Sequence, residues 1–386
     1  MIRVILISSV SPSPHSAGQF LLYRHLVDEP EINLQACNIE PRKGTLREVI
    51  RRILGRLSRT GLNPFCQDVM TLWRAGWIDA ELNAPEDKGV PTVVMTVAHQ
   101  EACYAAMRYA KKHDLPLVTF FHDWWPDIPK VHRPFRRILE KSFLGLYDKS
   151  SLALCVSSGM KTELGPHPNS RVLLPIPAHV DCQKSDVVAH KDLPFRLLYA
   201  GNLNGYGPML MKALETLKDH PDIRLEVRGD SSSWPESIKK EMTSRGLLLP
   251  FVQREELTEW LESADGFLIT QSFDKEQQRL MVTNFPSKLP EFAQFGKPLI
   301  IWGPNYSSGP IWARKTDQAL VVDEEEPQYL VQAMEQLCEN TDEQKRLGEA
   351  AKAASSNCFD PMGIQSDFMK WLNGIATESS GFTLDI

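Results

Sequence analysis

One stretch of the chain, residues 283–301, carries side chains that can bind an anion and a sugar side by side. Pro286 suits the first turn of a helix, because its missing N–H would have no partner there. Ser287 and Lys288 follow in that turn, where free N–H groups and the positive dipole end attract an anion such as a diphosphate. Glu291, about one turn further on, can accept hydrogen bonds from a pair of sugar hydroxyls. The spacing therefore predicts a site where the helix start holds phosphates while Glu291 binds a pair of sugar hydroxyls.

The end of the same stretch indicates how it is built into a sheet. Gly296 stands where a C-cap glycine would stop the helix. Lys297 and Pro298 turn the chain into the apolar run 299–302, which is typical of a buried strand. We therefore expect a loop, a short helix and a buried strand.

A second group with chemical potential follows the apolar run 115–121. His122 and Asp123 come directly after it, and His99 follows the preceding strand-like run. The carboxyl ends of parallel strands share one edge, where active sites form. We expect His122 to donate to a substrate oxygen or to take part in proton transfer, with His99 on the same edge. The alternative for each histidine is a structural role. Trp124 and Trp125 either stack on a sugar or close the core.

The elements that must position these groups alternate between buried strands and helices along the whole chain. This pattern predicts an α/β fold of two Rossmann-like, doubly wound domains facing a central cleft. Loops of small residues join strand to helix near Gly18 and Gly201, and a plain turn is the alternative role for Gly18. We expect an N-terminal domain over residues 1–180, a linker over 181–194 and a C-terminal domain over 195–360. A helix over 361–376, which can cross back to the first domain, and a polar tail over 377–386 follow.

Composition narrows the functional classes. A net charge of −6 and a pI near 6.0 argue against nucleic acid as a partner. No apolar run reaches the roughly 18 residues of a membrane span, and the apolar N-terminal run is too short for a signal peptide. Seven scattered cysteines without a CxxC pair indicate neither a zinc site nor a disulfide framework. We therefore expect a cytoplasmic protein with reduced thiols and no metal or cofactor.

Residues 45–59 form a basic exception in this acidic chain. Apolar residues recur at helical spacing among five arginines. Such a helix can lie on an anionic membrane surface or meet a phosphorylated acceptor. The alternative is an ordinary solvated face on a helix packed against its domain.

The motifs together resemble one family, the GT-B glycosyltransferases, and within it the large retaining family four, the glycosyl transferases group 1. The resemblance covers nearly the whole chain, from the loop ending at Gly18 through His122–Asp123 and 199–201 to Arg228–Asp230. Its most specific part is residues 285–298. There Glu291 matches the second of two glutamates eight positions apart, which in the family holds the donor ribose. The backbone of Phe285, Ser287 and Lys288 matches the part that faces the diphosphate.

The sequence departs from the family pattern at two places. Thr283 stands at the position of the first glutamate, so a contact to the donor sugar is changed or lost. Asn202 stands where an arginine is usual, and the lysine that normally follows is absent. That basic pair neutralises the leaving diphosphate, so another cation must replace it. Lys288 is the best-placed candidate, with Arg228 and Arg254 as the others.

The resemblance implies transfer of a sugar from a nucleotide sugar to an acceptor hydroxyl, with retention and without metal. It also implies that the domain over residues 1–180 binds the acceptor and the domain over 195–360 binds the nucleotide-sugar donor. The acceptor would be a glycan, a lipid-linked molecule or a small molecule, which suggests polysaccharide biosynthesis. We expect His122, Lys288 and Asp123 to be catalytic. The expected donor-binding residues are Glu291, Ser287, Phe285, Thr283, Asn284, Gly18, Gly201, Asn202, Arg228 and Arg254. Two alternatives remain: an altered or inactive relative that only binds a ligand or partner, and a nucleotide-sugar 2-epimerase, for which no carboxylates poised for proton abstraction are identified.

Overall fold

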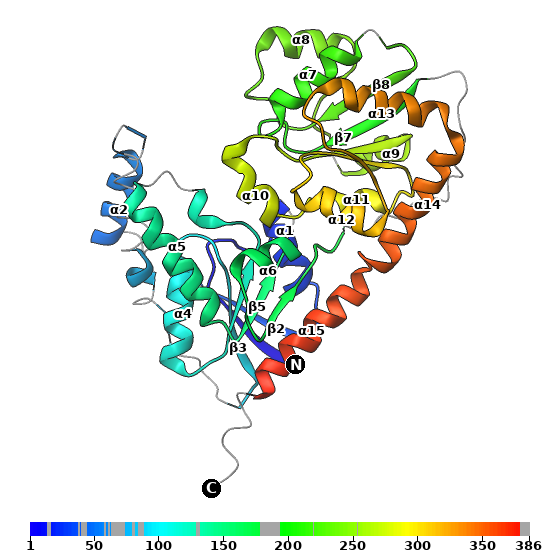
Figure 1. The fold of residues 1–386 in the computed structure, drawn as a ribbon. Coiled ribbons are helices and arrows are strands. Elements are labelled where there is room, and N and C mark those ends of the chain that lie inside the picture. Colours follow the sequence, from blue (N-terminus) through cyan, green and yellow to red (C-terminus); the bar gives the residue numbers. More distant parts are fainter. Residues whose placement is uncertain are drawn as a thin grey trace. The chain divides into compact units, whose positions relative to one another are not determined.

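The computed structural model has two sheets of six parallel strands each, and the chain divides into two units around them (Figure 1). The first unit holds residues 1–176 and 362–386, and the second holds 177–361. The structure describes residues 1–13, 17–37, 39, 45–57, 59–60, 62, 74–78, 82–83, 89–128, 132–177, 194–218, 220–252 and 254–378. Most of the predicted linker and most of the predicted tail lie outside these residues, and the predicted domain boundaries stay predictions.

The first unit alternates strands and helices around a sheet in the order β2-β1-β3-β4-β5-β6. Three of its strands, β3, β4 and β5, are buried along their whole length, which explains their largely apolar sequence. The elements are β1 (Ile2–Leu6), α1 (Ala17–Leu26), β2 (Ile32–Ala36), α2 (Leu46–Leu57), β3 (Thr92–Val97), α4 (Ala102–His113), β4 (Leu117–Phe121), η1 (Trp125–Asp127), α5 (Arg133–Asp148), β5 (Leu152–Cys155), α6 (Ser158–Leu164) and β6 (Ser170–Val172).

The second unit repeats the plan with a sheet in the order β12-β11-β10-β7-β8-β9. In each sheet the strand order reverses next to the first strand, so each unit is doubly wound, as predicted. The elements are β7 (Phe195–Ala200), α7 (Gly207–Leu217), β8 (Ile223–Arg228), α8 (Glu236–Ser244), β9 (Leu248–Leu249), α9 (Arg254–Glu262), β10 (Gly266–Thr270), η2 (Lys275–Gln277), α10 (Gln278–Thr283), α11 (Lys288–Ala293), β11 (Leu299–Trp302), α12 (Ser308–Thr316), β12 (Leu320–Val322), α13 (Pro327–Glu339), α14 (Thr341–Asn357) and α15 (Pro361–Glu378).

Local sequence signals set several helix ends. Ser157 caps α6, because its side chain accepts a hydrogen bond from the Met160 N–H, as predicted. Gly296 follows α11 with a φ of 61°, a left-handed conformation that glycine adopts without penalty. A Cβ at Gly296 would also lie 2.4 Å from Cε of Lys352 on α14, and one at Gly348 would lie 2.7 Å from the Gly296 carbonyl oxygen. Both glycines therefore let α11 and α14 approach closely.

The helix α15 belongs to the first unit through polar and aromatic contacts with α1. The Gln365 amide donates to the carbonyl oxygen of His25 (3.2 Å) and to Glu29 (2.9 Å), and its oxygen lies 2.8 Å from the His25 Nδ1. The buried Phe368 ring lies 5.0 Å from the His25 ring, centroid to centroid. Among the described helices, none is long and apolar enough to cross a membrane.

Acid should weaken the fold of the first unit through His25. Burial lowers the pKa of His25 from 6.5 to about 4, although the Gln365 hydrogen bond opposes the shift. The unfolded chain takes up this proton near pH 6.5 and the folded chain only near pH 4, so stability falls as the pH falls through that window. The loss reaches up to about 3 kcal/mol. Urea unfolding across this pH range should show a steeper loss for the wild type than for His25→Gln, and equal slopes would contradict the assignment.

Candidate functional site

The predicted donor residues gather at the carboxyl edge of the second sheet. β7 and β10 are neighbours at the point where the strand order reverses, and ligands of doubly wound sheets bind at such a point. The loop 201–206 follows β7, and the buried Gln271 and Ser272 follow β10. The second sheet therefore has a preformed polar edge where a nucleotide can be bound.

Gln271 organises this edge. Its side chain is 1% exposed and makes four hydrogen bonds. The Nε2 group donates to the Met281 carbonyl oxygen (3.3 Å), to Oδ1 of Asn284 (3.1 Å) and to Oγ of Ser308 (3.2 Å). The Oε1 atom accepts from the Gly309 N–H at 2.8 Å. One amide thus joins the end of β10, the loop after α10 and the first turn of α12.

The loop 284–287 is held from both sides. Asn284 ends α10 by donating its N–H to the Leu280 carbonyl oxygen, while its side chain contacts Gln271. Phe285 turns inward against Trp312 and Phe359, with centroids at 6.4 and 6.1 Å. Its side chain is thus a packing anchor, which leaves the backbone as the part that can meet a ligand.

The short helix α11 begins later than predicted. Ser287 is its N-cap residue and is exposed, with no side-chain capping bond, and Pro286 precedes the helix. The helix has only six residues, so its dipole is small and the backbone N–H groups of the loop are the main attraction for an anion.

Glu291 and Lys288 pair with each other. The Lys288 Nζ lies 2.7 Å from Oε2 of Glu291, and the two side chains are 38% and 28% exposed. Both predicted ligand contacts thus lie on one partly exposed helix face. Their charges offset each other while no ligand is bound, so a bound diphosphate must compete with Glu291 for the lysine.

Thr283 occupies the position of the first family glutamate but faces the interior. It is the last residue of α10, a helix that the sequence did not predict, and it is fully buried. Its hydroxyl donates to the Arg279 carbonyl oxygen at 2.9 Å. The carboxylate expected at this point in the family is replaced by a side chain that serves the helix itself.

Asn202 and its neighbours form a tight turn after β7. The Asn202 Oδ1 accepts from the Gly205 N–H at 2.8 Å, and the Gly201 N–H donates to the Arg228 carbonyl oxygen at 3.1 Å. A Cβ at Gly229 would lie 2.2 Å from the Gly201 carbonyl oxygen. Glycine at 229 thus lets the loops after β7 and β8 touch, and Asn202 shapes the turn.

The other two candidate cations lie toward the far edge of the second sheet. Arg228 at the end of β8 donates to the Pro250 carbonyl oxygen (2.8 Å), and its guanidinium lies 4.7 Å from the Trp260 ring centroid. These contacts commit its side chain to the region of β9 and α9. Arg254 is the first residue of α9.

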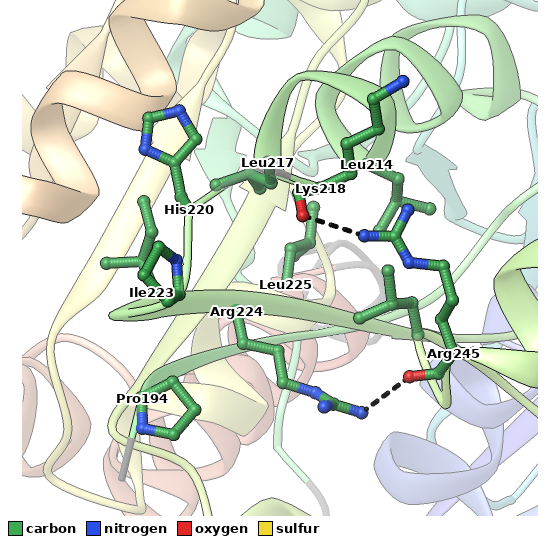
Figure 2. A pocket seen from close by; sticks show the side chains of 11 residues that line it. Pro194, Leu214, Leu217, Lys218, His220, Ile223, Arg224, Leu225 and Arg245 are labelled. Carbon is green, nitrogen blue, oxygen red and sulfur yellow. Dashed lines mark hydrogen bonds between the residues drawn. The ribbon is translucent and has the colours of Figure 1, made fainter. Parts of the chain in front are cut away.

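A cavity of about 190 Å³ opens at the opposite, amino edge of the second sheet (Figure 2). It lies between the end of α7 and the starts of β8 and β9, over an apolar floor that includes Leu214, Leu217 and Leu225. Its two arginines join loops: Arg245 donates to the Lys218 carbonyl oxygen, and Arg224 donates to the Arg245 and Gly246 carbonyl oxygens. No predicted site residue lines it.

The first unit brings its two histidines together, as expected for one sheet edge. The rings of His99 and His122 have centroids 6.0 Å apart, and the His122 Nε2 lies 2.9 Å from Oδ2 of Asp123. The Nδ1 atoms of both histidines are buried without a hydrogen-bond partner. His122 thus keeps one ring nitrogen without a hydrogen-bond partner, buried in this structure, while Asp123 holds the other one.

Burial sets the protonation of this pair. Burial, together with a smaller contribution from the neighbouring His122, lowers the pKa of His99 from 6.5 to about 4. Burial tends to raise the pKa of Asp123, but the hydrogen bond and charge of His122 outweigh it and keep the pKa below its usual value. At neutral pH the edge therefore has an ionised Asp123 and a neutral His99.

The remaining predicted residues of the first unit have simpler positions. Gly18 is the second residue of α1, rather than part of the loop before it. Trp124 and Trp125 are both 3% exposed and belong to the core, so core packing is the role that the structure gives them. Among the described residues, no three His, Cys, Asp or Glu side chains lie close enough to share a metal ion.

Sequence reasoning missed Gln271, Ser308 and Gly309. Gln271 directly follows a predicted buried strand at its carboxyl end, which is the positional signal that drew attention to His122. The Ser308–Gly309 pair before Pro310 resembles a helix start, since proline at N3 has no N–H to cap. Neither signal indicates that the Gln271 side chain forms hydrogen bonds with Ser308 and Gly309.

The family model of the glycosyl transferases group 1 matches residues 184–354, which lie in the second unit and include its whole candidate site. No curated protein sequence matches the chain.

Solved structures match over nearly the full length. Anabaena HepE in complex with UDP has a TM-score of 0.62 and 14% identity, covering 97% of this chain and 100% of its own. Sucrose-phosphate synthase from Thermosynechococcus elongatus has a TM-score of 0.65 and 11% identity, covering 98% and 100%. A glycosyltransferase from Rickettsia africae has a TM-score of 0.63 and 15% identity, covering 97% and 98%. The chain therefore has the GT-B fold, as predicted, and resembles the glycosyl transferases group 1.

Proposed function

We propose that this protein is a glycosyltransferase that transfers a sugar from a nucleotide-sugar donor to an acceptor hydroxyl. The observation that carries the proposal is the edge of the second sheet, where Gln271 fixes the loop 284–287 and Glu291 follows one turn later. The match of residues 184–354 to the glycosyl transferases group 1 supports it.

Each part of this edge has a role in the proposed reaction. Glu291 accepts hydrogen bonds from the donor ribose, and the backbone N–H groups of residues 285–288 face the diphosphate. As the bond to the sugar breaks, negative charge grows on the departing nucleotide. Lys288 then leaves its ion pair with Glu291, contacts the diphosphate and stabilises that charge. No other side chain needs to be charged for this step.

In the first unit, His122 is proposed to contact a hydroxyl of the transferred sugar or of the acceptor. Asp123 holds the Nε2 of His122 at 2.9 Å, and the proposed contact uses the buried Nδ1, which has no partner and must become accessible when the substrate binds. His99 packs beside it as a neutral ring.

The finer features of the reaction are also proposals. Transfer is with retention, without an enzymic carboxylate nucleophile and without a bound metal, and the sugar is a hexose. UDP is the first nucleotide to test, because the HepE complex contains UDP. The acceptor is a glycan or a lipid-linked molecule made in the cytoplasm, as in polysaccharide biosynthesis.

Incubation of the protein with a panel of nucleotide sugars tests the proposal. Release of a nucleoside diphosphate from one donor, even by slow hydrolysis, is the expected result. Loss of that release in His122→Ala, with nucleotide affinity retained, would support the role of His122. No release from any donor, with or without acceptor sugars, would overturn the proposed activity.

Replacement of Lys288 by alanine should mainly lower turnover. The lysine is held by Glu291 in the free protein, so its interaction with the diphosphate develops as the charge grows in the transition state. We expect turnover to fall about tenfold to a hundredfold, with a smaller change in UDP affinity. Steady-state kinetics measures both. Lys239→Ala, which breaks another i,i+3 pair with Glu236, is the control; loss of binding with turnover intact would contradict this role.

A second candidate function is that of an altered relative that binds a nucleotide without transfer. The buried Thr283, whose hydroxyl bonds to its own helix, favours it, because the first family glutamate has no replacement there. Such a protein would bind UDP or another nucleoside diphosphate and release none from any nucleotide sugar. The same panel therefore separates the two candidates.

A further inference from the structure

The amphipathic helix α2 has its apolar side turned away from the protein. Leu46, Val49, Ile53 and Leu57 recur every three or four residues and are 75%, 45%, 49% and 36% exposed. We call these four residues the α2 stripe. Figure 1 shows α2 at the margin of the first unit, away from the strands. A helix that only covered a core would bury these residues and expose its charges.

The inner side of α2 is polar. Glu48 is 7% exposed, and its carboxylate accepts a hydrogen bond from Arg52 at 2.6 Å. Its N–H contacts Oγ1 of Thr45 at 3.3 Å. Arg47 donates to the Trp77 carbonyl oxygen at 3.4 Å. These Glu48 bonds stay within residues 45–52, whereas the Arg47 bond reaches Trp77 in the rest of the unit. The exposed α2 stripe thus lies away from the side that attaches the helix.

Positive charge borders the α2 stripe. The helix carries four arginines and one glutamate in a chain of net charge −6. Arg52, whose side chain is 63% exposed, and the exposed Arg56 lie within about one quarter turn of the stripe on one side, given about 100° per residue. Their long side chains can therefore reach an anionic surface that the apolar residues enter.

We propose that α2 docks on the surface of a membrane that contains anionic phospholipid. The α2 stripe would enter the boundary between headgroups and acyl chains, while Arg52 and Arg56 meet phosphate groups. A second copy of the chain fits less well, because it would bring a second row of arginines against the first. This inference rests on α2 alone and does not depend on the proposed reaction.

Vesicle sedimentation of the full chain tests the proposal. We expect the protein to bind vesicles of phosphatidylcholine with one third phosphatidylglycerol, to bind pure phosphatidylcholine vesicles much less, and to lose binding in high salt. The double variant Val49→Gln, Ile53→Gln should bind the anionic vesicles at least about tenfold more weakly, because it removes two inserted apolar side chains. The double variant Arg52→Gln, Arg56→Gln should lose about fivefold for each charge removed.

Matched controls use exposed residues of the second unit. Phe251 and Ile311 are 83% and 47% exposed, and the double variant Phe251→Gln, Ile311→Gln should bind vesicles like the wild type. The double variant Lys240→Gln, Lys315→Gln removes the same charge from α8 and α12 and should also bind normally. Unchanged thermal unfolding of the α2 variants shows that each remains folded.

Three outcomes would overturn the proposal. The wild type remains in solution with the anionic vesicles, or the α2 variants bind as well as the wild type, or the controls lose as much binding as the α2 variants. The α2 stripe would instead be an interface between copies if the wild type does not bind vesicles and forms a concentration-dependent dimer. In that case the double variant Val49→Gln, Ile53→Gln would be monomeric. Nucleotide-sugar turnover in solution should be unchanged in the α2 variants, so this test and that of the proposed activity fail separately.

Discussion

Substitution of Glu291 by alanine should weaken binding of UDP about thirtyfold. The carboxylate is the one acidic group that the motif places one turn after the anion-binding loop, and its side chain is 28% exposed on the helix face that includes Lys288. Loss of charge-assisted hydrogen bonds to a pair of ribose hydroxyls costs about 2 kcal/mol, which corresponds to that factor. Titration calorimetry with UDP measures the change in affinity. If the wild type does not bind UDP, the same titration is repeated with the other nucleoside diphosphates.

Because Glu291 and Lys288 form an ion pair, substitution of both residues tells more about UDP binding than substitution of Glu291 alone. Removal of Glu291 frees Lys288 for the diphosphate, which partly offsets the lost ribose contact. The double variant Lys288→Ala, Glu291→Ala should therefore bind UDP more weakly than Glu291→Ala, and the cycle of the four proteins gives the coupling. Glu291→Gln should lie between the wild type and the alanine variant.

The matched control is Glu236→Ala. Glu236 also pairs with a lysine three residues away, Lys239, but on α8. Its replacement should leave UDP affinity unchanged. An unchanged UDP affinity in a folded Glu291→Ala protein would refute the proposed contact between Glu291 and the ribose.

Substitution of Gln271 by leucine should destabilise the second unit and weaken nucleotide binding together. Leucine has a similar size but leaves the buried Gly309 N–H without its acceptor and releases Asn284. An unsatisfied buried N–H and the lost side-chain bonds cost about 3 kcal/mol. Because the loop 284–287 loses its inner anchor, we expect UDP affinity of the folded variant to fall about tenfold. Urea unfolding and calorimetry on the same samples measure the two effects.

Gln344 gives a control for stability alone. It is a buried glutamine of the second unit, on α14, and donates to the carbonyl oxygens of Leu337 and Cys338 at 2.7 and 3.3 Å. Gln344→Leu should lower stability while UDP affinity stays at the wild-type value. If Gln271→Leu behaves in the same way, Gln271 is a structural residue of the sheet edge and does not position the loop for the ligand.

The sequence by itself determined the architecture and the position of the motif. Short, largely apolar runs such as 117–121 and 299–302 are typical of strands covered on both faces, and their alternation with helices favours parallel sheets. Ser157 caps α6, and Gly296 has the left-handed φ expected of it, although α11 already ends at Ala293 with Gln294 as its C-cap residue. An N-cap and a left-handed backbone depend on the residue itself and its immediate neighbours. The spacing of three residues likewise places Glu291 and Lys288 on one face of the helix.

Only the tertiary structure decided which partners the polar side chains take. Gln271 binds Asn284 and Gly309, which are 13 and 38 residues away, and Arg228 turns to Pro250 and Trp260. The amphipathic pattern of residues 45–59 is the same whichever way the helix faces. In the structure Glu48 is buried, Arg47 bonds to Trp77 and the apolar side faces outward. Pattern and propensity act over a few residues, whereas these choices depend on groups that meet only after the sheets have formed.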